Sequence, residues 1–325
     1  MHRLVSEFRT IASGLRKIPG LVESCARIEG RIEKLSKPNG PPSAASPAGA
    51  SAEFVPAGHF YSVVPSKEDI ERSLAQPRGL PGGIDMRDKE QFELLERFVP
   101  FYRELPFSAE KQDGLLYAFE NRMYSYTDGI FLYAMLRHLK PRRIIEVGSG
   151  FSSAVILDTK KLFLAPSTDI TFIEPFTKSL RSVVPAPILD TVTVIEQPLQ
   201  NVDVQLFRSL GENDILFIDS THVVKTGSDL WYLFARVLPE LAPGVVIHFH
   251  DIFHPFEMPA DWLKAGRFWN ENYFLAAFLQ FNSAFRIELF ATYLHERHPD
   301  WFAAHMPLCL KNKGGNIWLR RVGPR

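Results

Sequence analysis

The chain has 325 residues, in which 37 Lys and Arg side chains balance 37 Asp and Glu side chains. The length predicts one large domain or two small ones, and the apolar fraction of 46% is enough for a buried core. A formal charge of zero argues against a protein that binds nucleic acid through the phosphate backbone. The sequence also lacks an apolar run of 18 residues, so we expect no membrane span.

The cysteines and the N-terminus bear on the compartment. Cys25 and Cys309 are too few for a disulfide framework. The charged N-terminus lacks the apolar stretch of a secretory signal. We therefore expect a cytoplasmic protein.

Residues 1–37 have the pattern of an amphipathic helical arm. Apolar side chains recur at alternating steps of four and three, which is typical of a heptad seam, and Pro19-Gly20 interrupts the pattern. Three interpretations fit: a short coiled coil that joins copies into a homo-oligomer, an arm that lies on its own domain, or a helix on a membrane surface. Residues 38–52 are rich in Pro, Gly, Ser and Ala, and this composition predicts a linker.

Residues 53–140 are interpreted as an N-terminal helical region on the substrate side of the molecule. The stretch 67–138 is mainly helical in pattern and is broken by a Pro- and Gly-rich loop at 76–83.

Residues 141–325 have the pattern of an α/β core, in which short β-branched runs alternate with helix-length segments. Near-continuous apolar strands separated by helices predict a parallel sheet that is covered on both faces. The five expected parallel strands are Arg143–Val147, Ile170–Glu174, Thr191–Ile195, Ile215–Asp219 and Val245–His250.

Two further runs, Phe285–Phe290 and Asn316–Val322, are also expected to be strands. The segment 291–314 between them contains no convincing helix long enough to cross the sheet, so an antiparallel closing pair is more natural. Together these elements predict a doubly wound seven-stranded α/β fold.

Ligands of open parallel sheets bind at the carboxyl ends of the strands, so the residues that end each run are the candidate site. The first run ends in Glu146-Val147-Gly148-Ser149-Gly150, where two glycines allow a tight turn and close approach to a ligand. Ser152 or Ser153 is a candidate cap for the next helix. The carboxylate of Glu146 suits a ligand that carries an amine or a positive charge.

The second run ends in Glu174, where a carboxylate is placed to accept hydrogen bonds from ribose hydroxyls. Sites for NAD and for S-adenosylmethionine both use this device. Glu174 therefore predicts a nucleoside ligand without deciding which one.

The fourth and fifth runs bring Asp219, His222, His250 and Asp251 to the same rim of the sheet. Two carboxylates and two imidazoles suit either a divalent cation at Asp219 and Asp251 or proton transfer. His222 is a plausible general base because its ordinary pKa is near neutral. His248, in the middle of an apolar strand, is expected to be a core residue.

An aromatic stretch follows Asp251, and 266–281 within it has a helical pattern. These rings are candidates for one wall of an acceptor pocket, which Tyr61, Tyr126 and Asp128 would complete, although each ring alone is more simply a core residue. The aromatic residues are Phe253, His254, Phe256, Trp262, Phe268, Trp269, Tyr273, Phe274 and Phe278.

The order and spacing of these motifs resemble class I S-adenosylmethionine-dependent methyltransferases, in particular bacterial methyltransferase-domain proteins of the small-molecule or sugar O-methyltransferase type. The resemblance covers about residues 55–322. It is carried by Glu146–Ser153, Phe172–Pro175, Asp214–His222, Leu241–Gly244 and His250–Phe253, with the flanking pieces Gly58–Ser62, Tyr126–Gly129 and Arg267–Tyr273.

The resemblance implies a Rossmann-like fold and S-adenosylmethionine as the cofactor. Gly148, Ser149 and Gly150 would lie along the methionine part of the cofactor, with Glu146 near its amino group. Glu174 would hold the ribose hydroxyls.

The same resemblance would place Gln197 and Asn201 near the adenine, and Asp219 beside the sulfonium and the substrate. The transfer is an in-line displacement, in which His222 or His250 would remove the proton of an acceptor hydroxyl.

One departure from the metal-dependent relatives concerns the fifth strand end. Asp251 is preceded by His250 and followed by Ile252, so the second acidic residue of the usual pair is missing. A divalent metal at Asp219 and Asp251 and a metal-free site both stay open.

Two other functions are compatible with the sequence. A protein that keeps the fold without turnover would use the helical arm as its working part and bind a nucleoside or act as a scaffold. A nicotinamide-dependent oxidoreductase would be built on a similar sheet, but Ser153 stands where a dinucleotide fingerprint has its third glycine.

Overall fold

The computed structural model describes residues 54–76 and 78–323. The predicted arm at 1–37 and linker at 38–52 lie outside the described residues and stay predictions. The chain divides into two units, Met1–Pro56 and Ala57–Arg325, and the second holds every helix and strand that the structure describes.

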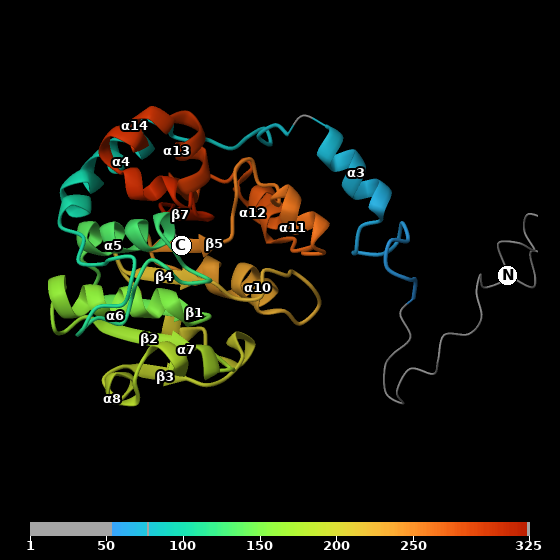
Figure 1. The fold of residues 1–325 in the computed structure, drawn as a ribbon. Helices are drawn as coiled ribbons and strands as arrows, with labels where there is room; N and C mark the ends of the chain where they lie inside the picture. The colour runs from blue at the N-terminus through green and yellow to red at the C-terminus, as the bar shows by residue number, and fades with distance from the viewer. Residues whose placement is uncertain (1–53, 77, 324–325) are drawn as a thin grey trace, which may run out of the picture. The chain divides into compact units, whose positions relative to one another are not determined.

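A seven-stranded sheet forms the centre of the second unit, with the strand order β3-β2-β1-β4-β5-β7-β6 (Figure 1). Strands β1 to β5 are parallel, β7 runs antiparallel to β5, and β6 runs antiparallel to β7. The predicted fold, five parallel strands with an antiparallel closing pair, is therefore confirmed. The strands are β1 (Arg143–Val147), β2 (Asp169–Ile173), β3 (Thr193–Ile195), β4 (Ile215–Ile218), β5 (Val246–His250), β6 (Phe285–Phe290) and β7 (Asn316–Arg321).

The helices before the sheet are α3 (Lys67–Ala75), α4 (Asp88–Arg103) and α5 (Thr127–Leu139). The helical prediction for 67–138 is wrong between α4 and α5, where 104–126 is irregular. Tertiary hydrogen bonds replace helical ones there, because the buried carboxylate of Asp158 accepts from the backbone N–H groups of Leu116 and Tyr117, at 2.8 and 2.9 Å.

The helices within the core differ from the prediction in one place, because the helix predicted at 266–281 is shorter. The segment 291–314 contains two seven-residue helices, each shorter than a usual crossover helix. This agrees with the predicted antiparallel pairing of β6 and β7. The helices are α6 (Phe151–Phe163), α7 (Lys178–Val183), α8 (Ala186–Leu189), α9 (Gln205–Arg208), α10 (Asp229–Tyr232), α11 (Ala260–Lys264), α12 (Glu271–Leu279), α13 (Ala291–Arg297) and α14 (Pro299–His305); short 3-10 turns lie at 199–201, 238–240 and 307–310, and a π-helical turn at 233–237.

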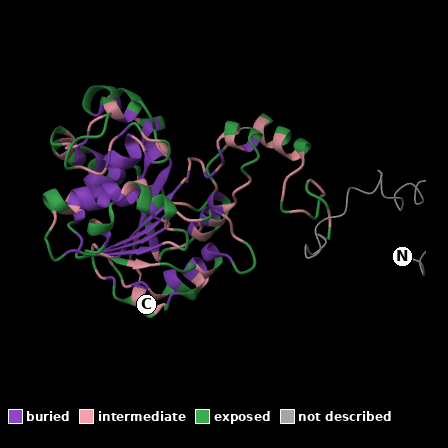
Figure 2. Cartoon of the chain, turned by 60° about the horizontal axis from the view of Figure 1, so that its bottom comes forward, coloured by how far each residue is buried: buried purple, intermediate pink, exposed green. Residues whose placement is uncertain are grey.

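The two faces of the sheet bury two separate cores. Alternate side chains such as Phe172 and Phe217 pack with α4, α5 and α6 on one face, and Ile173 and Ile218 pack with α10 and α12 on the other. The central strands are coloured as buried in Figure 2. This double burial explains why the strands are almost entirely apolar.

No helix in the described part of the chain has both the length and the apolar character to cross a membrane.

Asp214, at the amino end of β4, ties together the starts of two central strands. One carboxylate oxygen accepts from the backbone N–H groups of Arg142 and Arg143 at 2.9 and 2.8 Å, and the other accepts from Gly211 at 2.9 Å. The side chain is fully buried.

We therefore expect Asp214→Ala to lower the free energy of unfolding by about 2–4 kcal/mol, because it leaves buried N–H groups without acceptors. Asp214→Asn, which keeps one acceptor oxygen, should lose less. The measurement is urea denaturation, with the exposed Asp190→Ala as the control, expected within about 0.5 kcal/mol of wild type. Equal stability of Asp214→Ala and the control would contradict this account.

Candidate active site

The turn after β1 is pressed against the end of β4, at the point where the strand order reverses. Gly148 has φ +79°, and a Cβ atom built on it would lie 1.7 Å from the carbonyl oxygen of Asp219. The Gly148 N–H donates to Ile173 at 3.0 Å, and the Asp219 N–H donates to Val147 at 2.9 Å. Only glycine fits here, and the two predicted site residues Gly148 and Asp219 are thereby held in contact.

Glu146 lies under this turn as a fully buried carboxylate. One oxygen accepts from the Ser153 hydroxyl, and the other has no hydrogen-bond partner among the described residues. Burial raises the pKa of Glu146 to about 8, against the opposing effect of the hydroxyls of Ser152, Ser153 and Ser149. A buried carboxyl oxygen without a partner suits an amine or ammonium group of a ligand.

The capping of α6 differs from the prediction that Ser152 or Ser153 occupies the cap position. The helix begins at Phe151, so Gly150 is its N-cap residue. Ser153, one turn into the helix, accepts a hydrogen bond from the Gly150 N–H at 3.0 Å. Ser153 thus links the glycine turn to Glu146.

Glu174, directly after β2, is fixed by backbone donors on both of its oxygens. It accepts from the Ser149 N–H at 3.1 Å and from the Phe176 N–H at 2.7 Å. Each carboxylate oxygen keeps a second lone pair for a ligand hydroxyl. Gln197 and Asn201, expected at the adenine, are exposed beyond β3, and the ligand role of each stays a prediction.

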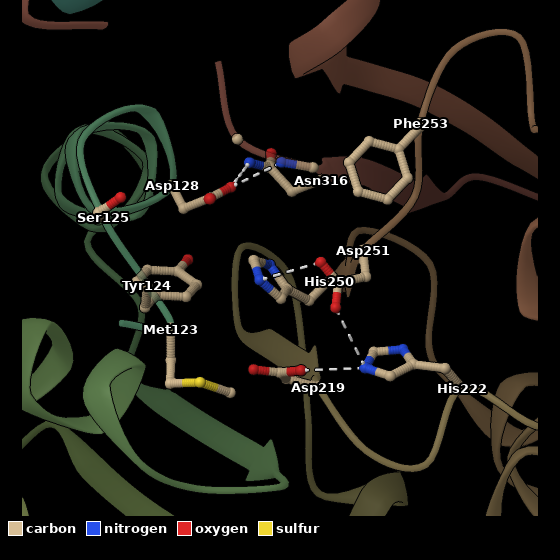
Figure 3. Close-up of polar contacts among 12 residues, drawn as sticks. Met123, Tyr124, Ser125, Asp128, Asp219, His222, His250, Asp251, Phe253 and Asn316 are labelled. Atoms are coloured by element: carbon tan, nitrogen blue, oxygen red, sulfur yellow. Dashed lines mark hydrogen bonds and ion pairs between the residues drawn. The ribbon is translucent and has the colours of Figure 1, made fainter. Parts of the chain in front are cut away.

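The four side chains expected at the rim of β4 and β5 do come together (Figure 3). Nε2 of His222 lies 3.4 Å from an Asp219 oxygen and 3.6 Å from an Asp251 oxygen. Nε2 of His250 lies 3.7 Å from the other Asp251 oxygen. His248 is buried and stacks on Phe217 at 3.9 Å, as expected of a core residue.

Residues at the amino end of α12 contact His222 and fix its position. Glu271 contacts Nδ1 of His222 at 2.8 Å, and the backbone N–H groups of Asn270 and Glu271 both donate to the His222 carbonyl. The ring of Trp269 stacks on the imidazole at 4.4 Å. No role for Glu271 could be predicted from the sequence, because 49 residues separate it from His222 and only the fold brings them together.

The charges of this cluster stabilise one another. Burial alone would lower the pKa of His222, but hydrogen bonds and charges of Asp219 and Glu271 raise it well above its usual value. Burial likewise opposes ionisation of Asp219, whose pKa is nevertheless lowered by His250 and His222. The geometry therefore favours an imidazolium between carboxylates in the free protein.

Asp128, on the first turn of α5, faces the same cluster. It accepts from the side-chain amide of Asn316 at 2.6 Å and from the Gly315 N–H at 3.1 Å. Burial raises its pKa, and the His250 charge opposes that shift. The sequence predicts that Asp128 lies near the acceptor. For Asn316 it predicts only a place in a strand.

Of the two other residues expected at the acceptor, Tyr126 contacts other side chains and Tyr61 lies at the surface. Tyr126 stacks on Phe119 at 5.2 Å, and its hydroxyl bonds to Glu120. Tyr61 is 67% exposed.

The aromatic stretch divides between the core and the site. Phe256 is buried, and Phe274 and Phe278 pack on the core. Phe253, Trp262 and Trp269 instead form an edge-to-face chain of half-buried rings, with centroids 5.2 and 5.5 Å apart, that ends on His222. These three rings are the part of the stretch placed to wall an acceptor.

Among residues 54–76 and 78–323, no group of three or more His, Cys, Asp or Glu side chains has an arrangement that would hold a metal ion. Asp219 and Asp251 both approach Nε2 of His222, so the imidazole already engages the two carboxylates expected to be metal ligands. The metal at Asp219 and Asp251 therefore stays a prediction.

An α/β sheet with a glycine turn and acidic residues at its reversal point is typical of the class of proteins that bind nucleotides or nucleosides. The family model described as "Methyltransferase domain" matches residues 145–252. An uncharacterised protein of Archaeoglobus fulgidus is 31% identical over 173 residues, which are 50% of this chain and 76% of that protein. The chain belongs to the methyltransferase-domain family, which confirms the resemblance to methyltransferases.

Solved structures with a similar arrangement include two O-methyltransferases. The O-methyltransferase TomG from Streptomyces achromogenes, involved in tomaymycin synthesis and solved with SAM, is 17% identical with a TM-score of 0.37, over 71% of this chain and 90% of that one. An O-methyltransferase from Bacillus cereus, solved with SAH, is 16% identical with a TM-score of 0.38, over 72% and 91%.

The contact between Glu271 and His222 predicts a change in the His222 titration. Glu271→Gln removes an anion that raises the pKa of His222. The pKa of His222 should therefore fall toward its usual value of 6.5. Because the folded pKa lies above the unfolded one, the stability contributed by protonated His222 is complete below about pH 6.5 and is lost as the pH rises through the folded pKa. The variant should lose stability over a lower pH range than wild type.

NMR titration of the His222 ring, with unfolding measured across pH, tests this prediction. Glu296→Gln, at the exposed partner of His254, is the matched control and should leave the His222 titration in place. An unchanged His222 pKa in Glu271→Gln would show that the ion pair does not set the charge of the ring.

Proposed function

We propose that this chain transfers a methyl group from S-adenosylmethionine to a hydroxyl oxygen of a small molecule or a sugar. The observation that carries the proposal is the unpartnered, buried oxygen of Glu146 beneath a glycine turn that touches Asp219. The glycine turn and Glu146 would bind the cofactor, and Asp219 with its neighbouring histidines would take part in proton transfer.

The cofactor half fits a nucleoside amino acid. The free oxygen of Glu146 matches its ammonium group, and the remaining lone pairs of Glu174 match the ribose hydroxyls. S-adenosylmethionine, when bound, supplies an electrophilic methyl group on a sulfonium. TomG and the Bacillus cereus enzyme, solved with SAM and SAH, support this choice of cofactor.

His222 is the proposed general base. As the acceptor oxygen gains the methyl group and the carbon–sulfur bond breaks, the hydroxyl proton passes to Nε2 of His222, which faces Asp219 and Asp251. Glu271 on Nδ1 orients the ring and stabilises its charge, as the third member of a hydrogen-bonded triad does. Since the pKa of His222 is raised, the base form and the transfer rate should increase with pH above neutral.

His250 is the second candidate for the base. It is buried beside Asp251, and its Nδ1 atom has no partner in the described part of the chain. The charges of Asp219, Asp251 and Asp128 raise its pKa against the opposing effect of burial.

Cofactor binding should depend on the ionisation of Glu146. The carboxyl has a pKa of about 8 and is mostly protonated at pH 7, whereas an ammonium partner requires the carboxylate. The affinity for S-adenosylmethionine should therefore increase between pH 6.5 and 8.5 and then level off. Glu146→Gln, a mimic of the protonated form, should bind about tenfold or more weakly at pH 8.5 and lose most of this pH dependence.

Isothermal calorimetry with S-adenosylmethionine, S-adenosylhomocysteine and NADH measures these affinities. Glu196→Gln, at an exposed ion pair beyond β3, is the control. Binding of NADH in place of both S-adenosyl compounds would support an oxidoreductase, and binding of none of the three would overturn the proposal.

His222→Gln should lower methyl transfer by about 10²- to 10⁴-fold, the usual contribution of a general base, and change the affinity for S-adenosylmethionine by less than about threefold. Transfer is followed from labelled S-adenosylmethionine into a panel of phenols, sugars and hydroxy acids. The exposed His305→Gln serves as control. Full activity of His222→Gln would move the role to His250, and no transfer by wild type to any acceptor while cofactor binds would favour a binding protein.

A further inference from the structure

Tyr124 carries a buried hydroxyl that nothing in the described part of the chain satisfies. The side chain is 2% exposed, and its hydroxyl oxygen has no hydrogen-bond partner among the described residues. Leaving such a group unpaired is costly in a folded protein, so it calls for an explanation. In Figure 3, Tyr124 lies on the same side of the site as Met123 and Asp128 and faces His250.

The ring cannot turn away to find a partner. It packs on His250 at 5.0 Å and on Phe217 at 6.1 Å. Its backbone is held twice by Asn121, whose side chain accepts from the Tyr124 N–H at 2.7 Å and donates to the Tyr124 carbonyl at 2.8 Å. The hydroxyl of Tyr117 donates to that carbonyl at 2.7 Å. The hydroxyl of Tyr124 is therefore fixed in place before any ligand binds.

The Tyr124 ring packs on residues that belong to, or pair with, both halves of the proposed site. Phe217, under the Tyr124 ring, is the register partner of Glu146 in the β1–β4 ladder and comes two residues before Asp219. Burial, followed by the charges of Asp128, Asp219 and Glu146, raises the pKa of Tyr124 well above its usual value. The phenol stays neutral, with an oxygen available in a region of negative charge that favours a cation.

We propose that the Tyr124 hydroxyl oxygen contacts the sulfonium methyl group of the cofactor. The inference rests on the proposed function and adds a residue that touches the reacting atoms. A sulfonium polarises its methyl hydrogens, and the phenol oxygen accepts this weak interaction. The contact holds the methyl group in line for transfer. It is available to S-adenosylmethionine but not to S-adenosylhomocysteine, which lacks both the charge and the methyl group.

Calorimetry with S-adenosylmethionine and S-adenosylhomocysteine tests the contact without an acceptor. Tyr124→Phe removes only the oxygen and should weaken S-adenosylmethionine about 3- to 10-fold while changing S-adenosylhomocysteine less than twofold. Tyr133→Phe, on α5, is the matched control. The Tyr133 hydroxyl already donates to the Glu104 carbonyl and accepts from the Arg137 guanidinium. The control variant should leave both affinities unchanged.

Thermal unfolding of the free protein gives a second readout. Tyr124→Phe should melt at or above the wild-type temperature since it removes an unpaired group, whereas Tyr133→Phe should melt roughly 2–4 °C lower. The proposal is overturned if Tyr124→Phe weakens the binding of both S-adenosyl compounds equally or weakens the binding of neither. It is also overturned if Tyr124→Phe is destabilised as much as the control. If wild type binds neither compound, the proposed function itself fails and this inference fails with it.

Discussion

The contact between the Gly148 turn and the carbonyl of Asp219 is the constraint on which the site depends. No side chain fits at Gly148, and the backbone there adopts a φ of +79° that favours glycine. The contact joins β1 to β4, where the strand order reverses. It fixes the distance between Glu146 and Glu174 on one side and Asp219 with His222 on the other. A larger residue at 148 would separate the proposed cofactor half from the proton-transfer half.

The charges beyond that contact are stable only as a set. Asp128, Asp219, Asp251 and Glu271 are held near two imidazoles, and burial by itself would make every one of these charges unfavourable. Removing one member leaves the others unpaired in a low-dielectric region, which costs more than the pair gains on formation. The protons of such a network belong to the group as a whole, so pH profiles will report the cluster rather than His222 alone.

The fold could be predicted because burial on both faces leaves a direct signature in the sequence. Runs such as Ile215–Ile218 are apolar throughout, and the residues that end them must meet at one edge of a parallel sheet. That topology alone predicts that Asp219, His222, His250 and Asp251 lie close together. Metal binding at this edge, in contrast, is not implied by the residue types alone.

The rest could not be predicted because it depends on contacts between distant segments. Glu271 reaches His222 only through the packing of α12, and Asn316 reaches Asp128 across 188 residues. Tyr124 lies in the segment 104–126, which has a helical pattern but is drawn into an irregular path by Asp158. A side-chain carboxylate that is supplied from another helix and accepts from backbone N–H groups outweighs local helix preference. No periodicity in the sequence marks such an acceptor.

The distribution of charge also bears on the direction of the proposed reaction. In the proposed complex, Asp219 and the oxygen of Tyr124 would face the sulfonium of the cofactor, whereas Glu146 would bind its ammonium group. Transfer removes that charge from sulfur and delivers a proton to a nearby imidazole. The carboxylates then stabilise the imidazolium instead of the sulfonium, so the negative charge of the site is used before and after the step. The thioether product keeps the ammonium group that Glu146 would bind but has lost the sulfonium charge, so Asp219 attracts it less strongly than the cofactor and its release is favoured.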